Sequence, residues 1–383
     1  MVDQITVEEL ADRLDAGESF ALVDTRPAGS FEAWHLHGAE NVPYHPHDGI
    51  DDGTLERIDA LADGGPVVAI CGKGLTSTSF GFELEEHGFQ DVTVVKGGME
   101  DWSEIYEVAE IELETDEDDL AIFQVQRRAK GCLGYVVGSR STGRAAVVDP
   151  TRHTDLFKIV AEEAGLTIEA VVDTHVHADH VSGGPILADE LGVSYYMGAH
   201  SADRDVTHEF EPVEDGDTIE VGDVTLEAIH TPGHTSDVTS YLVDDRFLLS
   251  SDTLFVESVG RTELQFGEAD ASRGAELLYE SLHERILDLP ADTVILPGHL
   301  SVTVDNRYEV GSPGEPIRAR LGDLREGLDL LGLGKEAFVE RLTGESSEKP
   351  PNYEEIIAIN TGRKSVGDDE AMQLELGPNN CAA

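Results

Sequence analysis

The densest group of potential metal ligands follows a short apolar run, residues 170–172. His175, His177, Asp179 and His180 occupy the pattern His-x-His-x-Asp-His within six positions. Imidazoles and carboxylates lose hydration when they are buried, and a cation is the partner that replaces it. The pattern therefore predicts a metal site on a loop directly after a strand.

Three further potential ligands stand at the ends of later apolar runs. His234 closes Thr-Pro-Gly-His, Asp252 follows Ser-Ser, and His299 closes Pro-Gly-His. Pro-Gly pairs are typical of tight turns, which would aim the imidazole that comes next. Isolated histidines are usually structural, but seven ligand-type residues in this arrangement predict convergence at one edge of a sheet.

Cys71 is a candidate nucleophile. It follows the apolar residues 67–70 and opens the loop Cys-Gly-Lys-Gly-Leu-Thr before a predicted helix. Backbone amides and the positive end of a helix dipole favour a thiolate in such a position. The alternative is an inert cysteine buried at a strand end. The two glycines favour the reactive thiol, and Lys73, the one charged residue of the loop, is a candidate for substrate binding.

Short strands and helices alternate over residues 5–105. Thr6 and Glu9 match a capping box for a first helix. Further elements are expected at 21–24, 67–70 and 92–95 for strands and at 76–87 for a helix. The alternation predicts a small, mostly parallel α/β domain. The acidic residues 106–120 that follow are interpreted as a solvated linker.

A second pattern covers residues 121–310. Strands are expected at 122–126, 135–137 and 146–148, and a helix at 155–164. Mixed strands with intervening helices indicate two packed sheets with helices outside. Residues 311–383 are richer in Pro, Gly and charge, which predicts a C-terminal helical extension and a loosely packed tail.

Acidic residues dominate the charge of the chain. Asp and Glu number 78 against 26 Lys and Arg, for a formal net charge of -52 over 383 residues. Such a surface repels itself at low salt, whereas at molar salt the Debye length falls to about 3 Å and the repulsion is screened. We therefore expect a halophilic protein, with neither nucleic acid nor an anionic membrane as its partner.

Cysteine use and hydropathy indicate a reducing, cytoplasmic location. Cys71, Cys132 and Cys381 are too few and too scattered for a disulfide framework. Cys132 is expected to pack as a small hydrophobe. We find no basic leader and no apolar run near the roughly 20 residues that a membrane helix needs. Whether the chain forms a homodimer stays open.

With these residues, the region 121–310 resembles the metallo-β-lactamase superfamily. The resemblance rests on His-x-His-x-Asp-His and on the later His234, Asp252 and His299. It implies an αββα sandwich with a metal site, so the expected fold class is α/β, a small parallel-sheet domain followed by this sandwich. The reaction stays open, because the superfamily hosts hydrolases and oxygenases alike.

Two branches of that superfamily compete. In ETHE1-like persulfide dioxygenases, the residues matching His175, His234 and Asp252 hold one Fe(II), whose remaining positions take a substrate sulfur and O₂. In glyoxalase II, a thioester hydrolase, all seven residues hold two metals, here two Zn, with a bridging hydroxide. In the first branch four residues surround the iron or form a second metal site: His177, Asp179, His180 and His299.

Three other segments resemble the dioxygenase branch: residues 131–135, 260–265 and 377–381. Arg261 falls where that family places a pocket arginine. The resemblance therefore implies that Arg261 clamps a carboxylate of the thiol carrier. A surface ion pair is the alternative for this arginine.

The first hundred residues resemble the front half of a rhodanese domain. The resemblance rests on Asp24-Thr-Arg26, Phe31-Glu32, His37-Gly38-Ala39 and Asn41-Val42-Pro43. Cys71 then matches the nucleophile that carries a persulfide. Gly72 and Thr76 stand where arginines are common, so we expect anionic donors such as thiosulfate to bind poorly.

Together, the resemblances imply an enzyme that oxidises a low-molecular-weight thiol persulfide to sulfite and thiol with O₂ at one Fe(II), coupled to sulfur transfer at Cys71. The alternative is a zinc-dependent hydroxyacyl-thioester hydrolase with an accessory rhodanese-like domain. A non-catalytic sulfur-binding scaffold is a third hypothesis, but it leaves seven clustered polar residues unexplained.

Overall fold

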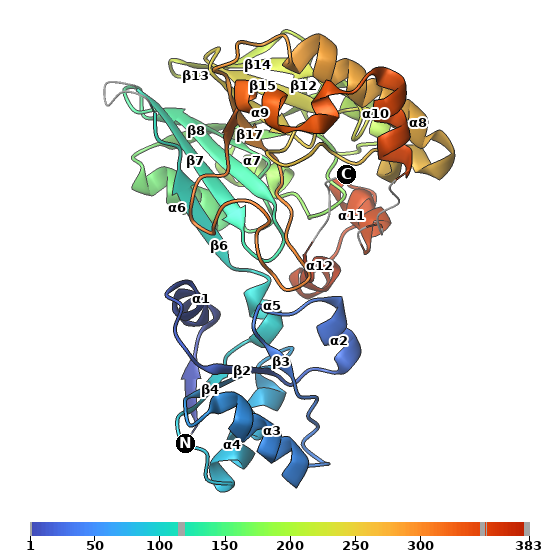
Figure 1. The fold of residues 1–383 in the computed structure, drawn as a ribbon. Coiled ribbons are helices and arrows are strands. Elements are labelled where there is room, and N and C mark those ends of the chain that lie inside the picture. Colours follow the sequence, from blue (N-terminus) through green and yellow to red (C-terminus); the bar gives the residue numbers. More distant parts are fainter. Residues whose placement is uncertain (1, 114–118, 345–348, 350, 379–383) are drawn as a thin grey trace.

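The computed structural model describes residues 2–113, 119–344, 349 and 351–378. The chain forms a smaller N-terminal part and a larger C-terminal part, which meet at a junction (Figure 1). None of the helices in these described ranges is long and apolar enough to cross a membrane.

The N-terminal part is a five-stranded parallel sheet in the order β1-β5-β4-β2-β3. Its strands are β1 (Asp3–Ile5), β2 (Ala21–Asp24), β3 (Glu40–Asn41), β4 (Val67–Ile70) and β5 (Val92–Val95). Its helices are α1 (Val7–Asp15), α2 (Ala28–Ala33), α3 (Asp52–Ala62), α4 (Leu75–Glu86) and α5 (Gly98–Trp102). Thr6 and Glu9 form the predicted capping box, because each side chain accepts from the other's backbone amide. The predicted parallel α/β domain is confirmed.

The C-terminal part contains two mixed sheets. The first has the order β12-β11-β10-β9-β8-β7-β6, and the second β13-β14-β15-β16-β17-β18. The first comprises β6 (Tyr106–Glu110), β7 (Leu120–Arg127), β8 (Leu133–Ser139), β9 (Arg144–Val148), β10 (Thr167–Asp173), β11 (Ser194–Gly198) and β12 (Glu211–Val213). The second comprises β13 (Thr218–Val221), β14 (Val224–His230), β15 (Thr239–Val243), β16 (Phe247–Ser251), β17 (Val294–Pro297) and β18 (Ala319–Arg320).

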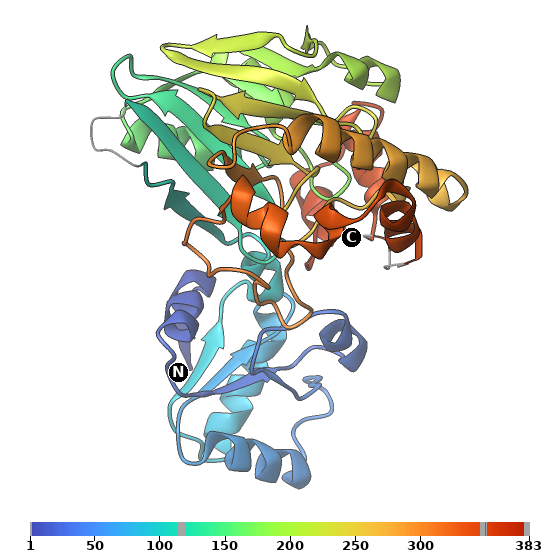
Figure 2. The same ribbon diagram turned by 45° about the horizontal axis from the view of Figure 1, so that its top comes forward.

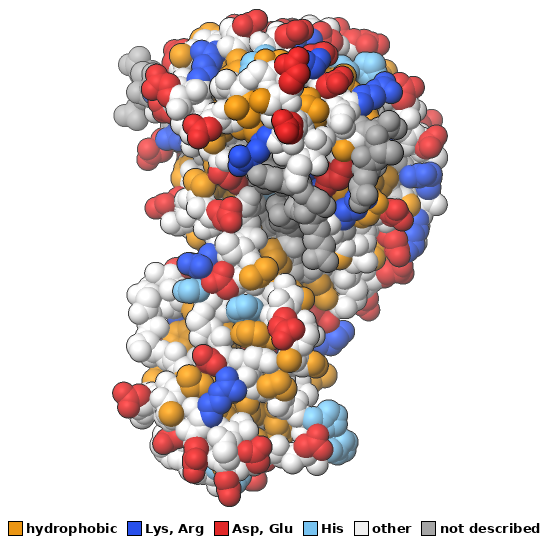
Figure 3. Space-filling model, turned by 45° about the vertical axis from the view of Figure 1, so that its right-hand side comes forward, with side chains coloured by type: hydrophobic (Ala, Val, Ile, Leu, Met, Phe, Trp, Pro, Cys, Tyr) orange, Lys and Arg blue, Asp and Glu red, His pale blue; other side chains and the backbone are white. Residues whose placement is uncertain are grey.

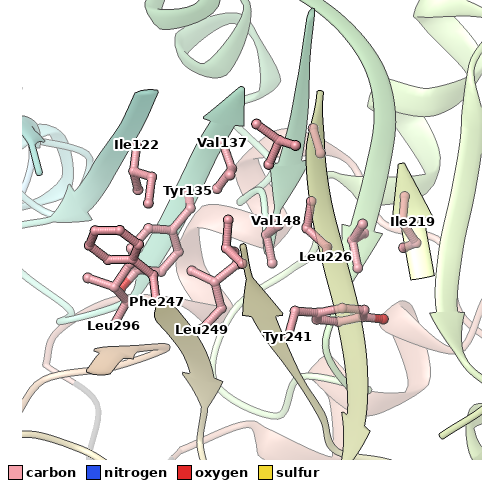
Figure 4. Close-up of a cluster of buried hydrophobic side chains, with 14 of the residues drawn as sticks. Ile122, Tyr135, Val137, Val148, Ile219, Leu226, Tyr241, Phe247, Leu249 and Leu296 are labelled. Atoms are coloured by element: carbon pink, nitrogen blue, oxygen red, sulfur yellow. The ribbon is translucent and has the colours of Figure 1, made fainter. Parts of the chain in front are cut away.

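The two sheets pack face to face around one apolar core. Tyr135 and Val148 of the first sheet lie opposite Tyr241 and Leu249 of the second, and all four side chains are buried (Figure 4). Buried apolar faces of two sheets exclude water from each other and hold the sandwich together.

Helices cover the outer faces of this sandwich. The helical segments of the C-terminal part are α6 (Thr154–Glu163), α7 (Gly184–Leu191), η1 (Ala199–Arg204), α8 (Glu263–Ser281), η2 (Leu282–Ile286), α9 (Leu321–Gly327), η3 (Asp329–Gly332), α10 (Lys335–Gly344), α11 (Tyr353–Asn360) and α12 (Asp368–Leu374). Phe157 of α6 and Leu187 of α7 pack on the first sheet. Leu278 of α8 and Phe338 of α10 pack on the second, where Figure 2 shows these helices. The layers are the αββα arrangement that the sequence predicts.

The interpretation of residues 106–120 as a linker differs from the structure. Residues 106–110 form β6, which pairs antiparallel with β7 at the edge of the first sheet. Ala109 and Ile111 are buried while Glu110 is exposed. An edge strand can carry many acids because one side of it faces water. Residues 114–118 lie outside the described residues, and the predicted domain boundaries stay predictions.

The expectation of a loosely packed tail is also wrong for the part of it that the structure describes. Ile356 of α11 is 1% exposed, and Glu375, directly after α12, is 0% exposed. Lys130 donates from Nζ to the Glu375 carbonyl at 3.1 Å. The tail is held by polar and ionic contacts at the junction, which an apolar periodicity does not reveal.

Several hydrogen bonds join the N-terminal part to the sandwich. The His35 amide donates to the Val304 carbonyl at 2.9 Å, and Trp102 Nε1 donates to Asn306 Oδ1 at 2.6 Å. Arg128 pairs with Asp15 of α1 at 2.5 Å. The α12 helix lies at this junction near α5 (Figure 1). On the face shown in Figure 3, acidic side chains are scattered over both parts of the chain rather than gathered in one patch.

Candidate metal centre and Cys71 loop

Strand directions bring the predicted ligands to one edge of the sandwich. β14 and β17 both run parallel to β16, so His234, Asp252 and His299 follow strand ends on the same side. His175 follows β10 of the facing sheet. The seven predicted ligands are buried, with relative exposures between 1% and 4%.

The three residues predicted to hold iron lie together. Ligand atoms of His175, His234 and Asp252 are within 4.8 Å of one another, and His234 Nε2 is 3.6 Å from Asp252 Oδ2. Ser251 has a left-handed φ of 52°, and a Cβ added at Gly298 would lie 2.8 Å from Asp252 Oδ1. A strained backbone and a glycine therefore make room for this carboxylate.

Hydrogen bonds set which nitrogen of each imidazole is available. Nδ1 of His175 lies 3.0 Å from Thr174 Oγ1 and 3.2 Å from Ser251 Oγ. Nδ1 of His234 donates to the Arg261 carbonyl at 2.7 Å. These partners leave Nε2 of each ring to face the other ligands.

The residues fit a metal cation. His175 Nε2 is buried and has no hydrogen-bond partner among the described residues, a state that costs about 1–3 kcal/mol for each such group. Burial lowers the pKa of His175 well below its ordinary value and lowers that of His234 to about 4. Both rings are therefore neutral at pH 7, the form that binds a metal.

A second group of potential ligands surrounds Asp179. Its Oδ2 lies 3.0 Å from His180 Nδ1 and 4.0 Å from His299 Nε2. Nε2 of His180 and both ring nitrogens of His299 are buried and make no hydrogen bond in the described part of the chain. His177, Asp179 and His180 also form a group with the spacing of metal ligands. This second group could hold another cation.

Cys132 joins the second group, which corrects the expectation that it packs as a small hydrophobe. Its Sγ lies 3.0 Å from Asp179 Oδ2, and Cys132, Asp179 and His299 have ligand atoms within 4.8 Å of one another. An isolated β-bridge pairs Cys132 with His299. Burial, followed by the charge of Asp179, raises the thiol pKa well above its ordinary value.

Arg261 lies beside the centre but is already paired. Its guanidinium is 1% exposed and donates from Nε to Glu263 Oε1 at 2.6 Å. A substrate carboxylate would therefore have to share Arg261 with Glu263. The backbone carbonyl of Arg261, which accepts from His234, is a role that the sequence did not suggest.

Cys71 lies at the end of β4, in the loop that leads into α4. Burial raises its thiol pKa, but hydrogen bonds involving the Ser77 and Thr76 side chains and the amides of Ser77 and Lys73 outweigh burial, so that the pKa is lowered. Ser77 Oγ donates to Cys71 Sγ at 3.3 Å. Gly74 has φ 75° at the start of the helix, a conformation that favours glycine. The setting stabilises a thiolate.

Lys73 is the cation of this loop and pairs with an acid of α5. Its Nζ lies 3.1 Å from Glu100 Oε1, with the lysine side chain 64% exposed. Glu100 offsets the charge that would attract an anionic donor. The predicted weak binding of such donors is consistent with this pair and stays a prediction.

Comparisons with known proteins cover both parts of the chain. A model described as metallo-beta-lactamase superfamily matches residues 127–299, and one described as rhodanese-like domain matches residues 6–105. The uncharacterized protein ML0493 of Mycobacterium leprae is 34% identical over 195 residues, which cover 44% of this chain and 86% of that protein. The chain belongs to the metallo-beta-lactamase superfamily. Its N-terminal part is a rhodanese-like domain.

Relatives within the superfamily include named dioxygenases. Persulfide dioxygenase ETHE1 of Homo sapiens is 34% identical over 172 residues, 43% of this chain and 62% of that protein. This chain thus spans 62% of the length of that curated relative. Among solved structures, ETHE1 from Myxococcus xanthus has 25% identity and a TM-score of 0.54, covering 63% of this chain and 97% of that one.

A second solved structure is about as similar to this chain but carries the name of a different kind of enzyme. A metallo-beta-lactamase from Staphylococcus aureus has 27% identity and a TM-score of 0.57, covering 64% of this chain and 73% of that one. The predicted superfamily, rhodanese-like domain and fold class are confirmed. The reaction is not decided by the superfamily, because the same fold carries different chemistries.

The sequence did not single out Asp149, which supports the metal loop, the segment that carries His175, His177, Asp179 and His180. Its Oδ1 accepts from the Thr174 amide at 2.7 Å and lies 3.1 Å from His177 Nε2. Its Oδ2 accepts from Thr174 Oγ1 at 2.9 Å. One signal was present: Asp149 directly follows the buried strand β9, just as Asp252 directly follows β16.

Proposed function

We propose that this protein is a persulfide dioxygenase that oxidises a low-molecular-weight thiol persulfide with O₂ at one Fe(II). His175, His234 and Asp252 would hold the iron, and their mutual proximity is the observation that carries the proposal. The sequence identity of 34% to persulfide dioxygenase ETHE1 of Homo sapiens supports the reaction class. The buried, partnerless Nε2 of His175 supports the presence of a cation.

The ligand set suits a reaction with two reactants. Two imidazoles and one carboxylate would hold the iron, and a bound Fe(II) would supply the redox chemistry for the reaction of O₂ with a persulfide sulfur. The persulfide RS–SH, O₂ and water would give the thiol RSH, sulfite and two protons. The Arg261 carbonyl keeps the His234 ring fixed throughout.

The chain's own residues also determine the environment of this reaction. The seven ligand-type residues are almost entirely buried, so the site excludes bulk water from the metal. Low pKa values keep His175 and His234 unprotonated, which preserves their lone pairs for the metal.

Cys71 would carry sulfur, either to feed persulfide to the iron site or to consume the sulfite made there. As a persulfide, Cys71–S–SH, it would pass its outer sulfur to a thiol RSH, giving RS–SH and the free Cys71 thiol. Alternatively, it would pass that sulfur to sulfite, giving thiosulfate and the same thiol. The lowered pKa of Cys71 supports both transfers, because a thiolate is the better nucleophile and leaving group.

Anaerobic purification followed by elemental analysis and an oxygen electrode tests the proposal. With glutathione persulfide as the probe, one iron per chain should accompany O₂ uptake and equal formation of sulfite. The His234→Ala variant should take up no O₂. An iron-loaded chain that consumes no O₂ with any low-molecular-weight persulfide would exclude the proposed reaction.

The zinc-dependent thioester hydrolase remains a second candidate because of the ligands around Asp179. Cys132, His180 and His299 place further donor atoms beside this carboxylate, and a dinuclear hydrolase needs such a second site. Two zinc ions per chain, hydrolysis of a hydroxyacyl thioester and no O₂ uptake would favour this candidate.

A further inference from the structure

The C-terminal extension holds the backbone of the metal loop. Asn360, at the end of α11, donates from Nδ2 to the His177 carbonyl at 2.9 Å and to the His180 carbonyl at 2.7 Å. The Ser182 amide donates to Asn360 Oδ1 at 2.9 Å. One side chain therefore bonds three backbone groups of the segment that carries His177, Asp179 and His180.

Glu375 holds the same loop from the end of α12. The Val181 amide donates to Glu375 Oε1 at 2.6 Å. Oε2 pairs with Arg152 Nε at 2.9 Å and with Arg127 Nη1 at 3.0 Å. Glu375 and Arg127 are both 0% exposed. Removing either partner would leave the other as an uncompensated buried charge, so the pair favours this position of Glu375.

The same helix reaches the other candidate site. Gln373, two residues before Glu375, donates from Nε2 to Glu100 Oε1 of α5 at 2.8 Å. Glu100 Oε1 is also the partner of Lys73 in the Cys71 loop. The Glu100 amide donates to the Gly72 carbonyl at 3.0 Å, and the Met99 amide to the Cys71 carbonyl at 2.8 Å.

A second connection converges on Glu375 through Arg152. Arg152 pairs with Glu375 and also with Glu104, which follows α5. Both connections run from α5, which holds the Cys71 loop, to the carboxylate that holds the metal loop. A continuous set of hydrogen bonds and ion pairs is the kind of contact that can transmit a change in position.

We propose that α12 couples the Cys71 loop to the metal loop, with Asn360 and Glu375 as positioning residues for the metal ligands and Gln373 as the link to α5. Binding of a metal orders residues 177–182, this fixes Glu375 and α12, and Gln373 then restrains Glu100 and the loop at Cys71. Such coupling is reciprocal, so order at the Cys71 loop also favours the metal-binding conformation.

This inference is independent of which reaction the protein catalyses. It concerns metal binding and backbone order. Both can be measured with Zn²⁺, which takes part in no redox step. Failure of the dioxygenase proposal would leave it standing, and failure of the coupling would leave the dioxygenase proposal standing.

Hydrogen–deuterium exchange of the full-length chain, with and without Zn²⁺, tests the link. In the unaltered protein, Zn²⁺ should slow exchange in peptides that cover both 177–182 and 71–77. In Gln373→Ala, Zn²⁺ should still slow exchange at 177–182, whereas the slowing at 71–77 should be smaller, because the connection through Arg152 and Glu104 remains. Glu370→Gln is the matched control, because Glu370 lies on α12 and pairs with Lys364 rather than α5.

Chelator competition for Zn²⁺ tests the positioning residues. Glu375→Gln and Asn360→Asp, which keeps the shape but cannot donate to the two carbonyls, should each weaken Zn²⁺ binding about 10-fold to 100-fold. Far-UV circular dichroism checks that each variant is folded. If Glu375→Gln does not fold, Asn360→Asp alone tests the positioning role.

Two results would overturn the inference. The first is hydrogen exchange at residues 71–77 that Zn²⁺ does not slow in the unaltered chain, or that Zn²⁺ slows equally in Gln373→Ala. The second is an unchanged Zn²⁺ affinity in folded Asn360→Asp and Glu375→Gln.

Discussion

Nε2 of His177 lies 3.1 Å from Oδ1 of Asp149, and both side chains are buried. Burial lowers the pKa of His177, but the charge and hydrogen bond of Asp149, with the charges of Asp173 and Asp179, raise it to about 10. The same carboxylate accepts from Thr174 Oγ1, which contacts His175 Nδ1. Asp149 thus supports two imidazoles of the metal loop at once.

Asp149→Asn should therefore weaken metal binding. Asparagine keeps the shape and tolerates the left-handed φ of 50° at this position, but its Nδ2 cannot accept from Thr174 Oγ1 as Oδ2 of Asp149 does. We expect about a 10-fold loss of Zn²⁺ affinity in chelator competition. Asp155→Asn, on the exposed side of α6, is the control. Equal affinity in both variants would show that Asp149 does not tune the site.

The pKa of the Cys71 thiol should lie below that of an ordinary cysteine. Its pKa is lowered because hydrogen bonds favour the thiolate despite burial. The rate of alkylation by iodoacetamide should therefore reach its plateau at a lower pH than that of a free thiol. Ser77→Ala removes a donor to Sγ and should move the profile to higher pH, whereas Ser79→Ala should not. A profile unchanged by Ser77→Ala would contradict this account.

Docking of the tail should weaken in acid through Glu375. Burial raises its pKa, but Arg127, Lys130 and Arg152 lower the pKa to about 2 in the folded chain, below the ordinary value of about 4.3. A lowered folded-state pKa stabilises the fold above the ordinary value, and that contribution disappears as the pH falls toward 2. Glu375→Gln lacks it, so the melting temperatures of the two proteins should converge as the pH falls below about 4.3. A constant difference across this range would refute the assignment.

The two chemistries should be separable by single substitutions. His234→Ala removes a metal ligand and should abolish metal-dependent turnover, while most sulfur transfer at Cys71 remains. Cys71→Ser should have the reverse effect. Cyanolysis of the protein persulfide and O₂ uptake measure the two activities. Loss of both in a folded single variant would mean that one site performs both.

High salt should stabilise the chain. With a net charge of -52, raising KCl from about 0.1 M to about 1 M shortens the Debye length from about 10 Å to about 3 Å and screens the acidic surface. The melting temperature should rise over this range. A neutral osmolyte at equal osmolality is the control, and a melting temperature that falls with KCl would contradict the predicted halophilic character.

The sequence alone determined much of the metal centre. His-x-His-x-Asp-His is a local pattern, and the apolar runs before Asp252 and His299 identified strands whose ends carry ligands. Local spacing is sufficient here because a strand end fixes where the next residue lies. The strands and helices of the rhodanese-like domain were predictable for the same reason, as Thr6 and Glu9 illustrate.

Only the tertiary structure decided which residues support those ligands. Cys132 reaches Asp179 because its chain segment pairs with that of His299, and Asn360 reaches His180 across 180 positions of the chain. Glu375 seemed part of a loose tail, yet its charge is buried against Arg127. A polar residue in an irregular segment carries no periodic signal, so its partners follow from the packing of distant elements rather than from its neighbours in sequence.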